Sequence, residues 1–205
     1  MKTKDFLIKS AGIGVQDALA ATEQLGRDSG LTQKENLRLR LLAEELLGMM
    51  RSITGEVEAQ YHAEETDHRY TLCLASEVKM TQEVRKLLLS VSSRGKNAAA
   101  KGFMGKIRDM IGAALLPDEN GLSFLSGFSL GLMSGAAVNG PAAQQVSADA
   151  FTWSMQKYKT GIDQDRDKNE EAWDELEKSI VASLADEVIV RIVGTRVEIE
   201  IQKAF

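Results

Sequence analysis

Residues 31–49 read LTQKENLRLRLLAEELLGM and carry the features of a capped, largely buried helix. Thr32 followed three residues later by Glu35 is the capping-box pattern that opens helices, so we expect a helix from residue 32 to about residue 53. Its leucines and methionines cover more than one narrow stripe, which predicts burial on several sides. Glu44 and Glu45 interrupt this apolar run. Two adjacent acids in a buried helix require a specific explanation.

The segments around this helix alternate between strand and helix patterns. Upstream, residues 5–9 predict a strand and residues 16–26 a helix. Downstream, two strands are expected at 56–62 and 69–75, joined by the acidic, turn-forming segment 64–68. Further elements are expected as a helix at 81–90, a short amphipathic helix at 103–116, a strand or one helical turn at 151–158, a helix at 170–185, and a hairpin of strands 188–193 and 196–201 around Gly194 and Thr195.

Composition restricts the class of protein. The chain has 205 residues, 43% of them hydrophobic and 27% charged, with a formal net charge of −5. This balance is typical of a globular domain, and it argues against nucleic acid as a partner because phosphate binding needs clustered Lys and Arg. Cys73 is the one cysteine, so no internal disulfide forms. Charged residues surround the short apolar patch at the N-terminus, which indicates no export signal and favours the cytoplasm.

Residues 121–148 contain no charged residue. Gly and Ser interrupt this stretch throughout, so we do not expect it to span a membrane, and a buried or mobile flap fits better. An oligomerisation or membrane-surface element is the alternative. We expect one α+β domain over residues 1–205: a two-layer α/β sandwich with a mixed, mainly antiparallel sheet, helices on one face, and a long irregular lid-like excursion at about 92–168.

Two segments, residues 31–49 and 180–201, resemble the GHKL family of ATPase domains, which have the histidine-kinase-like Bergerat fold, and in particular the bacterial anti-sigma factor serine kinases. The first segment is similar to the family's Leu-x-x-Glu-Glu-x-Leu-x-Asn helix, and the second to its last helix and closing strands. The resemblance implies that Glu45 is the catalytic base and that Glu44 lies in the nucleotide pocket. Met49 stands where the family has the Asn that binds Mg²⁺, and a thioether is a poor ligand for that ion.

Other family motifs are also altered. The Asp-x-Gly-x-Gly motif that anchors adenine corresponds to residues 75–80, which read ASEVKM and contain neither Asp nor Gly. Gly127 and Gly131 resemble the glycines of the lid that holds the triphosphate, although short glycine patterns recur by chance. Together with Glu44 and Met49, these glycines are the candidate nucleotide-binding positions.

Structural interpretations of these residues stay open. One of Glu44 and Glu45 can face solvent while the other pairs with Arg40, Arg38 or Arg51. His62 and His68 are expected to be polar surface residues, and no metal site is predicted. Cys73 is expected to be a small buried hydrophobe.

The resemblance therefore implies one of two functions. The first is a degenerate GHKL-like regulatory protein of bacterial signalling, which binds nucleotide weakly or not at all and docks on a protein partner of the sigma-factor or anti-anti-sigma kind. The second is an active ATP-dependent serine kinase or ATPase that uses Glu45 as base and ATP with Mg²⁺ as cofactor. A homodimer is compatible with both functions.

Overall fold

The computed structural model describes residues 1–52, 58–77, 105, 107, 111, 150–164 and 170–205. The strands are β1 (Phe6–Lys9), β2 (Glu58–Thr66), β3 (Arg69–Glu77), β4 (Ala150–Ser154), β5 (Glu187–Val193) and β6 (Arg196–Ala204). The helices are α1 (Val15–Asp28), α2 (Gln33–Ser52), α6 (Met155–Asp163), α7 (Glu170–Lys178) and α8 (Ile180–Leu184). Among these residues, no helix is both long enough and apolar enough to cross a membrane.

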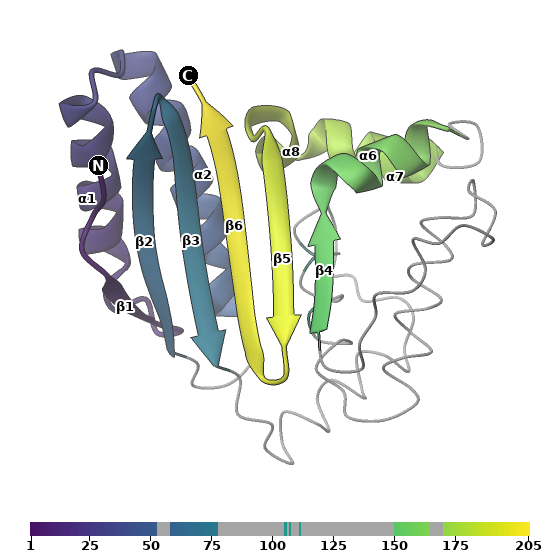
Figure 1. Cartoon of the computed structure of the whole chain (residues 1–205), viewed down its shortest axis with the longest axis horizontal. Helices are drawn as coiled ribbons and strands as arrows, with labels where there is room; N and C mark the ends of the chain where they lie inside the picture. The colour runs from purple at the N-terminus through teal and green to yellow at the C-terminus, as the bar shows by residue number, and fades with distance from the viewer. Residues whose placement is uncertain (53–57, 78–104, 106, 108–110, 112–149, 165–169) are drawn as a thin grey trace.

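The described strands form one six-stranded sheet in the order β1-β2-β3-β6-β5-β4 (Figure 1). Every neighbouring pair is antiparallel, whereas the sequence was expected to give a mixed sheet. The pairs β2–β3 and β5–β6 are hairpins of consecutive strands. A short turn can join two neighbouring strands only when they are antiparallel. The α+β class is therefore confirmed, and the sheet is simpler than predicted.

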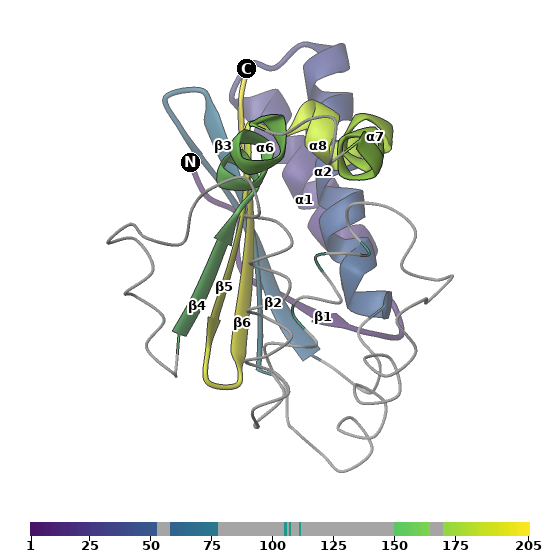
Figure 2. The same ribbon diagram turned by 90° about the vertical axis from the view of Figure 1, so that its right-hand side faces the viewer.

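Helices α1, α2, α7 and α8 lie on one side of the sheet, and no described helix lies on the other (Figure 2). Side chains alternate along each strand, so one face of the sheet is apolar and packs against these helices. On β3 and β6 this face carries Leu72, Leu74, Ile199 and Ile201, each at most 2% exposed. The core thus lies between the sheet and α2, as the layered prediction requires.

The predicted capping box at the start of α2 is present. The backbone N–H of Thr32 donates to Glu35 Oε2 at 2.9 Å, and the Glu35 N–H donates to Thr32 Oγ1 at 3.4 Å. These bonds satisfy two backbone donors at the helix N-terminus. The hydrogen bond that the Thr32 hydroxyl donates to Glu35 Oε2, followed by the one from the Thr32 N–H, holds the pKa of Glu35 below its ordinary value.

Three predicted elements differ from the structure. The turn expected at 64–68 contains only Asp67 and His68, both with positive φ (51° and 60°), so strand pairing continues to Thr66. Two positive φ angles are typical of the tight hairpin turns whose twist matches that of the strands. The helix expected at 170–185 is interrupted at Ser179, whose extended backbone and side-chain oxygen, which accepts from the Ala182 N–H, start a new helix.

The third difference concerns the irregular excursion expected at about 92–168. Residues 150–154 form β4 and residues 155–163 form α6, because Ser154, the last residue of β4, caps the helix by accepting from the Lys157 N–H. The Glu187 carboxylate also accepts from the Ser154 hydroxyl at 2.8 Å and the Gln156 N–H at 3.1 Å. A negative charge at a helix N-terminus is favourable, so Glu187 of β5 anchors α6 to the sheet.

Several predicted elements lie mainly outside the described residues. These are the helix at 81–90, most of the helix at 103–116, and the charge-free stretch at 121–148. From the second of them, Ile107 and Ile111 are helical and buried in the core.

Two glycines in α1 and α2 differ sharply in their surroundings. A Cβ on Gly26 would lie 2.2 Å from Asn36 Oδ1, whereas a Cβ on Gly48 would meet no atom within 4 Å. Asn36 is buried and its Nδ2 donates to the Glu23 carbonyl at 3.1 Å, so it is not free to move aside.

We therefore expect Gly26→Ala and Gly48→Ala to have effects of opposite sign. Overpacking should make Gly26→Ala destabilising by about 1–3 kcal/mol. The better helix propensity of alanine should make Gly48→Ala stabilising by up to about 1 kcal/mol. Urea unfolding of the two variants measures both changes, and equal effects would contradict the packing of Asn36 on Gly26.

Candidate functional site

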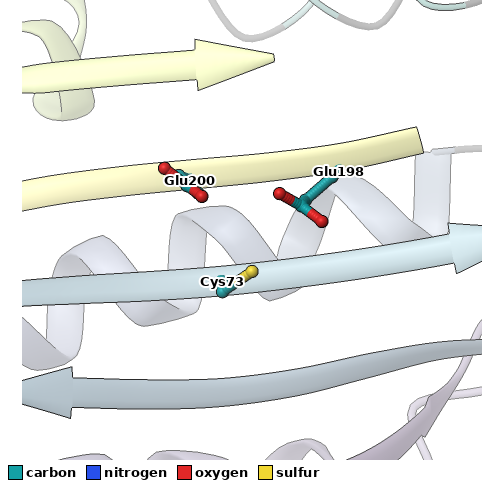
Figure 3. A group of neighbouring side chains, drawn as sticks. All are labelled: Cys73, Glu198 and Glu200. Carbon is teal, nitrogen blue, oxygen red and sulfur yellow. The ribbon is translucent and has the colours of Figure 1, made fainter. Parts of the chain in front are cut away.

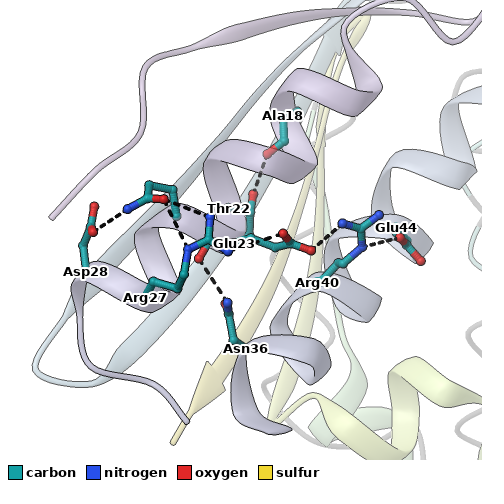
Figure 4. Close-up of polar contacts among 9 residues, drawn as sticks. Ala18, Thr22, Glu23, Arg27, Asp28, Asn36, Arg40 and Glu44 are labelled. Carbon is teal, nitrogen blue, oxygen red and sulfur yellow. Dashed lines mark hydrogen bonds and ion pairs between the residues drawn. The ribbon is translucent and has the colours of Figure 1, made fainter. Parts of the chain in front are cut away.

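The candidate site begins with the two acids of α2, and the structure separates their roles. The Glu44 carboxylate accepts from Arg40 Nε at 2.8 Å, and Arg40 Nη1 also pairs with Glu23 of α1 (Figure 4). The hydrogen bond from Arg40 holds the pKa of Glu23 below its ordinary value. Glu44 therefore belongs to a polar clasp between the two helices, as one of the structural interpretations proposed.

Further bonds extend this clasp along α1 (Figure 4). Arg27 donates to Gln24 Oε1, and Gln24 Nε2 donates to Asp28 Oδ1 at 2.6 Å. Deeper in the core, the Thr22 hydroxyl donates to the Ala18 carbonyl and lies 2.7 Å from the Tyr61 hydroxyl of β2. Burial raises the pKa of Tyr61, so its hydroxyl stays protonated at neutral pH. These contacts fix α1 and α2 on the sheet.

Glu45 differs from Glu44 in having no hydrogen bond or ion pair within the described part of the chain. Consecutive residues on a helix point about 100° apart, so Glu45 turns away from α1 while Glu44 faces it. Met49 follows Glu45 by one helical turn and shares its flank. Its side chain is 4% exposed and belongs to the hydrophobic core.

The burial of Met49 makes this flank of α2 a poor site for a metal ion. A hard cation such as Mg²⁺ needs several oxygen ligands, and here the corresponding side chain is a thioether packed among apolar groups. Ser76, in the stretch that the resemblance aligns with the adenine motif, donates its hydroxyl to the Glu58 carbonyl at 2.8 Å within the sheet. Gly127 and Gly131 lie outside the described residues, so their predicted lid role is untested.

The face of the sheet opposite the helices holds a second polar cluster. Potential ligand atoms of Cys73, Glu198 and Glu200 lie within 4.8 Å of one another (Figure 3). Cys73 of β3 is the direct cross-strand partner of Glu200 on β6. The alternation of Glu198 and Glu200 was visible in the sequence, but their meeting with Cys73 depends on the pairing of β3 with β6.

Ion pairing already satisfies the two carboxylates of this cluster. Arg191 Nη1 lies 3.0 Å from Glu198 Oε1 and 2.5 Å from Glu200 Oε1. Burial, followed by the charges of Glu198 and Glu200, raises the pKa of the Cys73 thiol to about 11. A metal ion would have to displace both the guanidinium and the thiol proton. The arrangement is therefore an ion-pair network beside a buried neutral thiol, as expected for Cys73.

The two histidines are polar and lie near the surface, as predicted. His62 Nε2 is 3.2 Å from Glu64 Oε1, and its Nδ1 is 3.4 Å from Asp5 Oδ1. His68 is exposed in the β2–β3 turn.

The raised pKa of Cys73 predicts slow alkylation. Since the thiolate is the nucleophile, the rate of iodoacetamide labelling of the folded chain should keep rising with pH above 9. In urea the same thiol should reach half of its maximum rate at a pH near its ordinary pKa of about 9. Mass spectrometry of timed reactions measures both curves. A plateau for the folded chain at the same pH as for the unfolded chain would contradict this environment.

Comparison with protein-family models, with curated proteins and with solved structures gives no match to this chain. Its function is therefore inferred from its own residues and their geometry.

Proposed function

We propose that this chain is a degenerate GHKL-like domain of bacterial signalling that regulates a protein partner by docking, without depending on nucleotide. The observation that carries the proposal is the burial of Met49. It occupies the position at which the resemblance requires a magnesium-binding Asn, and it is 4% exposed within the core. A polar ligand has been replaced by a packing residue, so this flank of α2 contributes to stability where an active kinase would bind metal.

The order and layering of the elements support the resemblance. A strand, two helices and a β-hairpin precede the excursion, and a helical segment followed by the closing hairpin β5–β6 comes after it. β6 pairs with β3, so α2 packs across a sheet built from both ends of the chain. This is the scaffold on which the expected nucleotide pocket, between the second helix and the sheet, would have been built.

The engagement of Glu44 also favours docking over catalysis. Arg40 bonds to Glu44 and to Glu23, which ties this carboxylate to the contact between α1 and α2. A residue held in a helix–helix clasp has a structural reason to be acidic. The partner that the resemblance implies is a protein of the sigma-factor or anti-anti-sigma kind.

The carboxylate of Glu45, which has no partner among the described residues, favours a second candidate function, an active GHKL-type serine kinase or ATPase. Among the described residues Glu45 forms no ion pair, and a general base needs a carboxylate that is free to accept a proton. In this alternative, ATP and Mg²⁺ would be held by contacts other than those of the family motifs.

A nucleotide titration separates the two functions. We expect no change in thermal stability with Mg-ATP or Mg-ADP. A ligand at 100 times its dissociation constant would add about 2.7 kcal/mol to the free energy of unfolding, so nucleotide binding would be detected. Differential scanning fluorimetry, repeated by calorimetry, makes the measurement. Stabilisation by Mg-ATP would overturn the proposal.

In that event Glu45→Gln serves as the matched variant. If Glu45 is the base, the variant should keep the nucleotide-induced stabilisation and lose phosphoryl transfer. Loss of both, or of neither, would remove Glu45 from the catalytic role.

A further inference from the structure

The outward side of α2 carries a stripe of residues that the described core does not use. These residues recur at spacings of three, four and seven, as on one face of a helix, and we call them the outer stripe of α2: Lys34, Leu37, Arg38, Leu41, Glu45 and Gly48. Glu44 follows Leu41 by three residues and precedes Gly48 by four, so the polar clasp borders the stripe on its α1 side. Figure 2 shows α2 in the helical layer that covers one side of the sheet.

The centre of the outer stripe is apolar. Leu37 is 56% exposed, and Leu41, one turn later, is partly exposed and lies outside the buried core. One exposed leucine is ordinary on a protein surface. Two leucines one turn apart, on the same face of a helix, form the repeating contact by which helices pack against each other.

Gly48 adds an independent feature. Glycine inside a helix costs about 1 kcal/mol relative to alanine. Gly48 is exposed, and a Cβ there would meet no atom within 4 Å, so packing inside the described chain gives no reason for it. A glycine on a helix surface allows another backbone to approach closely.

The charges of the outer stripe are separated along the helix. Lys34 and Arg38 lie in its N-terminal half, and Glu45 lies in its C-terminal half. Within the described residues, none of these three side chains forms an ion pair. A second copy of α2 packed antiparallel would bring the basic half of each helix against the acidic half of the other. Parallel packing would place like charges together, which is unfavourable.

We infer that the outer stripe of α2 is a self-association surface, on which two copies of this chain pair α2 against α2 in antiparallel orientation around a two-fold axis near Leu41. Such an interface is isologous, because the same surface serves both subunits. Leu37 and Leu41 form its apolar centre, Gly48 admits the N-terminal turn of the opposite helix, and Arg38 faces the acidic end of the second copy.

One helix per subunit is a small contact, below the standard interface size of about 1,600 Å². The dimer should therefore be weak and depend on protein concentration. This association does not rest on the GHKL-like proposal, since it is argued from the exposure and charges of the outer stripe and is tested without nucleotide.

Sedimentation equilibrium of the full chain at low ionic strength tests the inference. The average mass should rise with concentration from 22.4 kDa toward twice that value. Leu41→Lys should keep the chain monomeric, while circular dichroism shows an unchanged fold because Leu41 is partly exposed. A monomer at every concentration, or a dimer that survives Leu41→Lys, overturns the inference.

Charge-reversal variants test whether the two α2 helices pack antiparallel. Arg38→Glu and Glu45→Arg should each weaken the dimer, and the double variant should restore it, because the reversed charges again face each other. Lys157→Glu on α6 makes the same change in net charge as Arg38→Glu, away from the stripe, and should leave the dimer intact. A double variant as weak as the single variants would overturn the antiparallel arrangement.

Discussion

The pairing of β3 with β6 is the contact on which the rest of the structure depends. It joins residues 69–77 to residues 196–204 over nine aligned positions, from Arg69 opposite Ala204 to Glu77 opposite Arg196. Without it, β1-β2-β3 and β6-β5-β4 would be two separate three-stranded sheets, and α2 would lose the continuous apolar face on which it packs. Since side chains alternate with period two, a shift of one residue would turn the leucines of β3 away from α2.

The apolar face created by this pairing explains why the inward-facing residues of α2 are apolar. The helix lies against Leu72, Leu74 and Ile199. Residues of α2 that face the sheet or its flanks are buried there and must be apolar, and Met49 is one of them. The clasp of Arg40, Glu23 and Glu44 then fixes the angle of α2 against α1 with side chains that remain partly solvated. Under the proposed function, such a scaffold keeps its shape while its polar contacts hold α1 and α2 together.

On the opposite face of the sheet, polar groups also pair with one another. Arg191 lies between Glu198 and Glu200, and Cys73 completes the group as a protonated thiol. These groups compensate one another, because a guanidinium can bond two carboxylates at once. The outer stripe of α2 differs because its charges lack such partners within the described residues. Because of this contrast, the outer stripe of α2 is a better candidate for an interaction surface than the open face of the sheet.

The sequence by itself determined the local features of this protein, because they depend on neighbours in the chain. The capping box at Thr32 and Glu35, the closing hairpin, and the burial of Cys73 follow from short-range patterns and were predicted correctly. Tertiary structure decided which acid of α2 is structural, since Glu23 lies 21 residues before Glu44, and it decided that Cys73 meets Glu198 and Glu200. It also decided that the sheet is antiparallel throughout. These outcomes depend on which distant segments pack together, and packing energy exceeds the weak local preferences that a sequence pattern records.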